Sequence, residues 1–161
     1  MKRPSARNSP PLEIERKYLL SALPEEALRV TPQKIEQGYI PGEKLIERLR
    51  RVQDEKGVRY FRTVKLGRGA VRIEIEEETT AKIFRTMWPL TRGRRVKKVR
   101  FAVRVGKHIW EIDDFRDRDL VLAEVELTSE GETANMPPWI KRVLVRDVTD
   151  ESKYVNARLA K

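Results

Sequence analysis

The chain has 161 residues, of which 37% are charged and 39% are hydrophobic, and its formal net charge is +10. This length predicts one domain with a substantial core, and the apolar content argues against global disorder. The absence of cysteine and the presence of one histidine exclude disulfides, iron–sulfur clusters, thiolate nucleophiles and multi-histidine metal sites. Any metal ion must therefore bind mainly to oxygen, which favours Mg²⁺, Mn²⁺ or Ca²⁺.

The same composition narrows the cellular location and the binding partners of the protein. No charge-free stretch reaches about 18 residues, and the N terminus lacks the apolar core of a signal peptide. We therefore expect a cytoplasmic protein without a membrane-spanning segment. The basic balance fits either solvated lysine and arginine side chains or a polyanionic partner such as nucleic acid, polyphosphate, a nucleotide or an anionic membrane.

Residues 1–11 are basic and rich in proline and serine, which predicts a disordered tail ahead of a single folded domain over residues 12–161. Alternating apolar and polar residues predict eight strands. These cover residues 12–20, 35–40, 45–52, 58–66, 71–78, 95–105, 108–115 and 121–127. Short helices are expected at 23–30, 79–89, 137–144 and 150–160, the second of them capped by Thr79 or Thr80 and ended by Pro89. The predicted fold is mainly β (β-rich α+β), an eight-stranded antiparallel closed β-barrel with a few flanking helices, because closure removes exposed sheet edges.

One face of most predicted strands carries charges at alternating positions, and apolar residues such as Ile75, Phe101, Ile112 and Val125 lie on the opposite face. The basic members are Lys17, Arg48, Arg50, Lys65, Arg72, Lys98 and Arg100, and the acidic members are Glu13, Glu15, Glu74, Glu76, Glu111, Asp113, Glu124 and Glu126. A face that simply meets water is one interpretation. If the barrel closes with this face inward, unpaired charges are heavily penalised, so the interior must hold water, ions or a polyanion. Because carboxylates hold hard metal ions and basic side chains hold phosphate, the pattern favours metal–phosphate binding.

Residues 13–17 read Glu-Ile-Glu-Arg-Lys, an ExExK motif at the start of the first predicted strand. Further motifs follow in order: QGY at 37–39, ERLR at 47–50, TVK at 63–65, EIE at 74–76, RRVKKVR at 94–100, EID at 111–113, EVE at 124–126, and VTD at 148–150 with Tyr154 and Asn156. Over roughly residues 12–160 the sequence thereby resembles the CYTH superfamily, the triphosphate tunnel metalloenzymes. It looks most like the short bacterial members that hydrolyse inorganic tripolyphosphate.

The resemblance implies an eight-stranded tunnel barrel and assigns roles to its charged residues. The implied metal ligands, for Mg²⁺ or Mn²⁺, are Glu13, Glu15, Glu124 and Glu126. The implied phosphate-binding residues are Lys17, Arg48, Arg50, Lys65, Lys98, Arg100 and, if the C-terminal helix folds over a tunnel mouth, Lys153. Glu74, Glu76, Glu111 and Asp113 are implied to orient these cations or to hold a second metal. Tyr39 and Lys65 are implied as a catalytic pair that activates water. Lys98 is an alternative base, and Tyr39 is alternatively a packed strand aromatic.

The expected activity is therefore metal-dependent hydrolysis of inorganic triphosphate. The expected partner is this small molecule, not a membrane or nucleic acid, and a homodimer is left open. Nucleoside or thiamine triphosphatase activity is an alternative in the same tunnel. A class IV adenylate cyclase is less favoured, because those enzymes usually carry His-Phe ahead of ExExK, where this chain has Ser-Pro-Pro-Leu at 9–12. A non-catalytic polyphosphate- or RNA-binding module is the alternative of another class, opposed by carboxylates that would repel its ligand.

Overall fold

The computed structural model describes residues 14–66 and 73–161, so the predicted tail, Glu13 and Arg72 lie outside the described residues. Nine strands pair antiparallel in one sheet, in the order β5-β4-β3-β2-β6-β7-β8-β1-β9. The strands are β1 (Ile14–Leu20), β2 (Gln33–Ile40), β3 (Leu45–Asp54), β4 (Gly57–Leu66), β5 (Ile73–Thr79), β6 (Arg95–Val105), β7 (His108–Phe115), β8 (Val121–Leu127) and β9 (Leu144–Asp147). All eight predicted strands are confirmed, and the mainly β class with them.

The helical elements are short. They are η1 (Glu25–Arg29), α1 (Ala81–Met87), η2 (Trp88–Thr91), α2 (Pro138–Lys141), η3 (Ser152–Tyr154) and α3 (Asn156–Leu159). Helix α1 begins as predicted, because the Thr80 hydroxyl accepts a hydrogen bond of 3.1 Å from the Ile83 amide. Within the described ranges, no helix has the length and apolar character needed to cross a membrane.

The predicted closure of eight strands into a barrel is not confirmed. A ninth strand, β9, pairs with β1, and the sheet stays open by hydrogen bonding, with β9 and the described part of β5 at its two edges. Strand β9 was not predicted because all four of its side chains are exposed, so its sequence lacks the alternation of a half-buried strand. Its register with β1 also shifts between Leu19 and Leu20.

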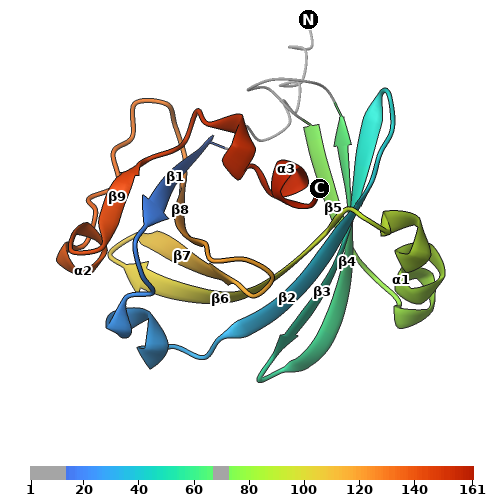
Figure 1. The fold of residues 1–161 in the computed structure, drawn as a ribbon, viewed down its shortest axis with the longest axis horizontal. Coiled ribbons are helices and arrows are strands. Elements are labelled where there is room, and N and C mark those ends of the chain that lie inside the picture. The colour runs from blue at the N-terminus through green and yellow to red at the C-terminus, as the bar shows by residue number, and fades with distance from the viewer. Residues whose placement is uncertain (1–13, 67–72) are drawn as a thin grey trace, which may run out of the picture.

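The sheet curves strongly, and the helices divide between its two sides (Figure 1). On the convex side, the buried Trp110 and Val125 pack with Ala27 of η1 and Ile140 of α2. On the same side but over the other half, α1 packs on β4, where the rings of Phe84 and Tyr60 lie 4.9 Å apart. These apolar layers cover the convex side of the sheet, and the charged residues lie on the other side.

The end of the chain lies inside the curve of the sheet (Figure 1). The helix predicted for 150–160 is instead two short pieces, η3 and α3, separated by Val155 in an extended conformation. The bend lets the segment follow the concave surface, where Val148 and Ala160 are buried in one cluster with Tyr39 and Leu122. The predicted helix at 137–144 is likewise shorter, because the chain leaves α2 to form β9.

Candidate functional site

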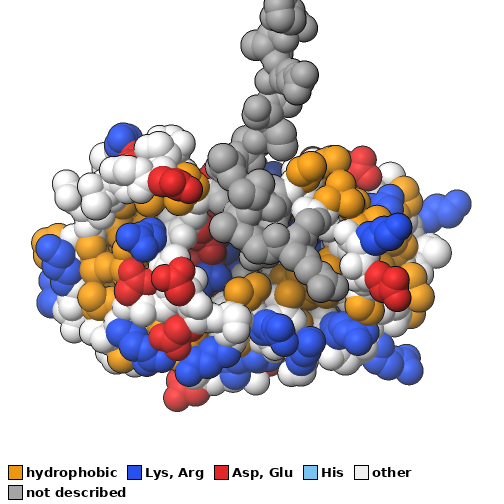
Figure 2. Space-filling model, turned by 90° about the horizontal axis from the view of Figure 1, so that it is seen from above, with side chains coloured by type: hydrophobic (Ala, Val, Ile, Leu, Met, Phe, Trp, Pro, Cys, Tyr) orange, Lys and Arg blue, Asp and Glu red, His pale blue; other side chains and the backbone are white. Residues whose placement is uncertain are grey.

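The strand registers bring most of the predicted charged residues to the concave face, in two groups. The first charged cluster consists of Glu15, Lys17, Lys98, Arg100, Glu111, Asp113 and Glu124, on β1, β6, β7 and β8. The second charged cluster consists of Arg48, Arg50, Thr63, Lys65, Glu74 and Glu76, on β3, β4 and β5. From above, acidic and basic side chains are visible close together in a recess near the middle of the view (Figure 2).

Asp113 is the centre of the first charged cluster, and its side chain is fully buried. It accepts hydrogen bonds of 2.7 Å from Nε and Nη2 of Arg100, one to each oxygen, and one of 2.5 Å from Nζ of Lys98. Burial raises the pKa of Asp113, but the charges of Arg100 and Lys98 outweigh it and hold that pKa below its usual range. Asp113 is therefore a carboxylate that orients two buried cations.

The remaining contacts of this cluster run outward toward the edge of the site. Glu124 lies 3.3 Å from Nη2 of Arg100 and 3.2 Å from Nζ of Lys17, and Lys17 lies 3.3 Å from Glu15. Arg100 also pairs with Glu111. Lys17 and Arg100 each contact carboxylates on two strands, and Lys98 contacts Asp113, so the three cations are held in position without a ligand.

The second charged cluster is organised around Arg48. Its Nη2 atom donates to Glu74 at 3.1 Å, to Glu76 at 2.8 Å and to the buried Thr63 hydroxyl at 3.1 Å. Arg50 donates to Glu76 at 2.5 Å, and Lys65 lies 3.0 Å from Glu74. Among the described residues, the buried Nε atoms of Arg48 and Arg50 have no hydrogen-bond partner. Burial and the adjacent Arg48 charge lower the pKa of Arg50, so this cluster favours an added anion.

Three of the four predicted metal ligands are described, and they are neighbours. Glu15 lies opposite Glu126 in the β1–β8 register, and Glu124 lies opposite Lys17 on one side and Glu111 on the other. Partial loss of solvation within the concave face and the Glu124 charge raise the pKa of Glu15, although its side chain is still about half exposed. Burial likewise raises the pKa of Glu111, and the nearby Arg100 only partly offsets it. Carboxylates that repel one another in this way are stabilised by a cation.

The donor set fits a hard divalent ion, because it consists of carboxylate oxygens. One buried oxygen of Glu124, Oε1, accepts no hydrogen bond and has only the ion pair to Lys17 as a described contact. Over residues 14–66 and 73–161, no three metal-binding side chains are already close enough to hold an ion. The fourth predicted ligand, Glu13, lies outside the described residues.

Tyr39 lies on β2 between the two clusters and is buried. Burial raises the pKa of its hydroxyl more than the charges of Arg48 and Arg50 lower it. Lys65 lies on β4, two strands from Tyr39, and the registers pair Tyr39 with Arg48 but Lys65 with Ile46. Arg48 in turn pairs with Thr63, so Lys65 stands two residues along β4 from the position in line with Tyr39, and the two backbones are at least about 10 Å apart across two strand spacings.

No family model matches the chain. An inorganic triphosphatase from Nitrosomonas europaea is 35% identical over 92% of this chain and 96% of its own length. One from Acetivibrio thermocellus is 31% identical over 92% and 93%. A crystal structure of an inorganic triphosphatase matches with a TM-score of 0.64 and 32% identity, over 92% of this chain and 93% of that one.

This chain belongs to the CYTH superfamily, together with those inorganic triphosphatases. The similarity to these relatives extends over 92% of the chain. In the CYTH fold of this protein, Lys17, Lys98 and Arg100 lie on one wall of the concave face. Arg48, Arg50 and Lys65 lie on the other wall.

The predicted phosphate-binding residue Lys153 is not brought to either charged cluster. The C-terminal segment does reach the concave face, but the Lys153 side chain is 66% exposed, pairs with Glu151 at 3.5 Å and lies against the ring of Tyr154. The contacts of this segment with the site come instead from the Tyr154 carbonyl, 3.4 Å from Nζ of Lys17, and from Asn156, whose Oδ1 lies 3.3 Å from Nζ of Lys98.

Sequence reasoning assigned no role to Gln37, Thr63 or Asn156, although all three contact site residues. Gln37 and Thr63 each stand two positions before a predicted residue, Tyr39 and Lys65, and so share its face of the strand. That period of two was the available signal. Asn156 was singled out with Tyr154 after the VTD motif, but no local pattern showed its contact with Lys98, which spans 58 positions of the chain.

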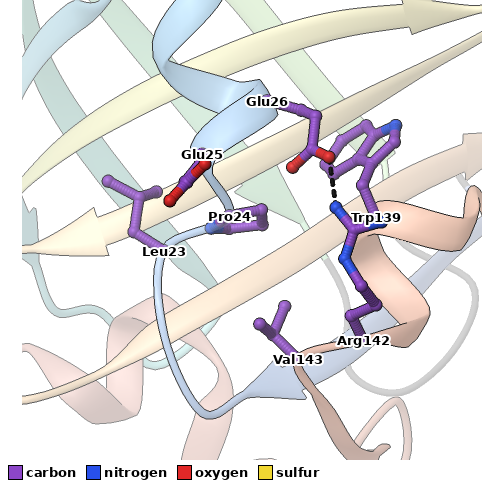
Figure 3. A pocket seen from close by; sticks show the side chains of 7 residues that line it. All are labelled: Leu23, Pro24, Glu25, Glu26, Trp139, Arg142 and Val143. Carbon is purple, nitrogen blue, oxygen red and sulfur yellow. Dashed lines mark hydrogen bonds and ion pairs between the residues drawn. The ribbon is translucent and has the colours of Figure 1, made fainter.

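A separate hollow lies between η1 and α2, with a volume of about 390 Å³. Figure 3 shows Trp139 and Arg142 of this hollow facing Glu26, which pairs with Arg142. Its lining includes none of the predicted site residues. The hollow is thus distinct from the two charged clusters.

Proposed function

We propose that this chain is a metal-dependent hydrolase that cleaves a phosphoanhydride bond of inorganic triphosphate on the concave face of its sheet. The observation that carries the proposal is the pair of charged clusters that face one another in a chain of this family. Cations on both walls match the charge of a triphosphate, and carboxylates at the β1–β8 edge match the needs of a metal ion. A plain polyanion-binding module would gain nothing from those carboxylates.

The basic residues would bind the phosphate chain from two sides. Lys17, Lys98 and Arg100 contact it from one wall, and Arg48, Arg50 and Lys65 from the other. Carboxylates hold these basic side chains in position before the substrate binds. Binding therefore costs little side-chain conformational entropy. The partnerless Nε atoms of Arg48 and Arg50 offer donors that phosphate oxygens can accept.

Glu15, Glu124 and Glu126, with Glu13 by family resemblance, would hold Mg²⁺ or Mn²⁺. Such an ion, when bound, neutralises charge on phosphate oxygens. Arg100 already contacts Glu124, and Lys17 contacts Glu15. Both cations would stabilise the negative charge that develops on the phosphate oxygens as the bond breaks. Glu74, Glu76, Glu111 and Asp113 would keep the cations in place.

Tyr39 and Lys65 remain the candidates for moving the proton of the attacking water. Tyr39 is buried beside both arginines of the second charged cluster, where its hydroxyl can donate a hydrogen bond to a phosphate oxygen or to water. Lys65 approaches from β4 and is the candidate proton acceptor.

The test is phosphate release from tripolyphosphate and from ATP, measured in parallel with Mg²⁺, Mn²⁺ or EDTA. We expect fast, metal-dependent release from tripolyphosphate and slow release from ATP. A preference for ATP would replace the proposal with a nucleotide enzyme, and product analysis would then separate a phosphatase from a cyclase. Inactivity on both substrates with metal present would favour the binding module.

A further inference from the structure

Arg59 lies on the same concave face as the second charged cluster, although no family motif includes it. The β3–β4 register pairs Arg48 with Thr63, Arg50 with Phe61, and Val52 with Arg59. Because side chains alternate along a strand, Arg59 and Phe61 face the same way as Thr63 and Lys65. Arg59 therefore continues the line of basic residues toward the β3–β4 turn.

Phe61 connects Arg59 to the cluster. The Cζ atom of Arg50 lies 5.9 Å from the centre of the Phe61 ring, and the Cζ atom of Arg59 lies 5.7 Å from it. The two guanidinium groups are thus at most about 12 Å apart, a separation that a few linked phosphate groups can span. A guanidinium held by an aromatic ring keeps its N–H groups for anions.

The hydrogen bonds of Arg59 are incomplete. Its Nη2 atom donates to Asp54 at 2.7 Å, and Asp54 is itself held by the Lys56 amide at 2.9 Å. In the described part of the chain, the buried Nε atom of Arg59 has no hydrogen-bond partner, as is also true of Arg50. Asp54 therefore positions the Arg59 side chain, and the Nε–H group of Arg59 remains available to donate a hydrogen bond to a ligand.

We propose that Arg59 and Phe61 form a subsite beside Arg50 for a fourth phosphate group, so that the site also takes linear polyphosphates longer than three units. This inference rests on the proposed function, because it requires Arg48 and Arg50 to bind phosphate. Two positive charges at the ring favour an anionic group over a neutral nucleobase.

Arg62 provides a matched control on the same strand. Its side chain is 34% exposed, against 36% for Arg59, and it lies 2.8 Å from Glu47 much as Arg59 lies 2.7 Å from Asp54. Arg62 is an odd number of positions from Arg59 and so points to the convex face. Substitution of either arginine removes one charge and a short ion pair, and for Arg62 also a longer one of 3.9 Å to Glu77, but only Arg59 faces the proposed subsite.

The experiment compares kcat/KM for linear tetrapolyphosphate and tripolyphosphate in the full chain and in the variants Arg59→Gln, Arg59→Lys and Arg62→Gln. We expect Arg59→Gln to lower the tetrapolyphosphate-to-tripolyphosphate ratio about tenfold, the effect of losing one charged hydrogen bond. Arg59→Lys should recover part of that loss, and Arg62→Gln should leave the ratio unchanged. An unchanged ratio in Arg59→Gln, or an equal change in Arg62→Gln, would overturn the subsite.

Failure of the proposed function has a different signature. If the unmodified chain hydrolyses neither polyphosphate with Mg²⁺ or Mn²⁺ present, the triphosphatase proposal is wrong. The subsite is then judged by calorimetric affinities for the same two polyphosphates. It is supported if Arg59→Gln selectively weakens tetrapolyphosphate binding, and it is overturned if both affinities change alike.

Discussion

The side chain of Gln37 donates a hydrogen bond of 2.9 Å from Nε2 to the hydroxyl oxygen of Tyr39, two residues further along the same strand. Gln37 is only 1% exposed, so solvent does not compete for this contact. Because the tyrosine oxygen accepts this bond, its own hydrogen is free to point toward the charged clusters. The pair favours Tyr39 as a hydrogen-bond donor to the substrate.

Gln37→Glu tests this relationship with a side chain of the same shape. A carboxylate cannot donate, so the Tyr39 hydroxyl should turn toward it and away from the substrate. We expect kcat for tripolyphosphate to fall about tenfold or more, as in Tyr39→Phe. In a Tyr39→Phe background, Gln37→Glu should have little additional effect on kcat. Full additivity of the two losses would mean that Gln37 acts independently of Tyr39.

Glu15→Gln tests the predicted metal ligands. Its side chain is 48% exposed, so the fold should survive, as circular dichroism would verify. We expect Mn²⁺ affinity, measured by calorimetry, and turnover of tripolyphosphate each to fall about 100-fold. Substitution of residues that only hydrogen-bond to metal ligands already lowers metal affinity or activity about 10- to 100-fold. The control is Glu36→Gln, since Glu36 pairs with Lys97 outside the site. Unchanged Mn²⁺ affinity in Glu15→Gln would remove Glu15 from the ligand set.

Asp113→Ala should be among the most destabilising single changes at the site. It would leave the buried Lys98 and Arg100 without their shared carboxylate. Breaking a buried charge pair in this way costs about 3–5 kcal/mol in the free energy of unfolding. Urea unfolding would measure it, with Asp114→Ala as the neighbouring control on the opposite face. A loss below about 1 kcal/mol would show that these cations do not depend on Asp113.

The pH dependence of stability should follow from the same residue. The pKa of Asp113 is lower in the folded protein than in the unfolded chain, because Arg100 and Lys98 outweigh its burial. The unfolded state therefore binds this proton more readily, so the stabilisation is present above about pH 4 and is lost as the pH falls below it. Unfolding free energies measured from pH 5 to pH 2 should decline less steeply in Asp113→Asn. Parallel curves for the two proteins would contradict the assignment.

Gly38 separates Gln37 from Tyr39 and is pressed from the convex side by Thr91. A Cβ atom at Gly38 would lie 2.6 Å from both Cβ and Oγ1 of Thr91. We expect Gly38→Ala to destabilise the fold by about 1–3 kcal/mol through this overlap, measured as a shift in the urea midpoint. Gly131→Ala is the control, because nothing lies within 4 Å of its added Cβ. Equal stability of the two variants would mean that η2 moves away at no cost.

Much of the concave face could be predicted from the sequence because alternation along a strand is a local property. A charge at every second position assigned Lys17, Arg48, Arg50, Lys98 and Arg100 to one face before any pairing was known. The apolar residues between them assigned the opposite face to the core, and the structure confirms this for Phe101, Ile112 and Val125. The same alternation did not predict that Ile75 is 57% exposed. Ile75 lies on the edge strand β5, and which strand lies at an edge depends on the order of the strands in the sheet.

Alternation along the chain therefore determined the eight strands and the set of charged residues that they present on one face. The tertiary structure decided which charges meet: that Lys98 and Arg100 share Asp113, and that Arg48 and Arg50 share Glu76. It also decided that β9 takes the edge of β1 and that Asn156 reaches Lys98. These contacts join residues far apart in the sequence. They depend on strand register and on packing against the curved sheet, which no local pattern encodes.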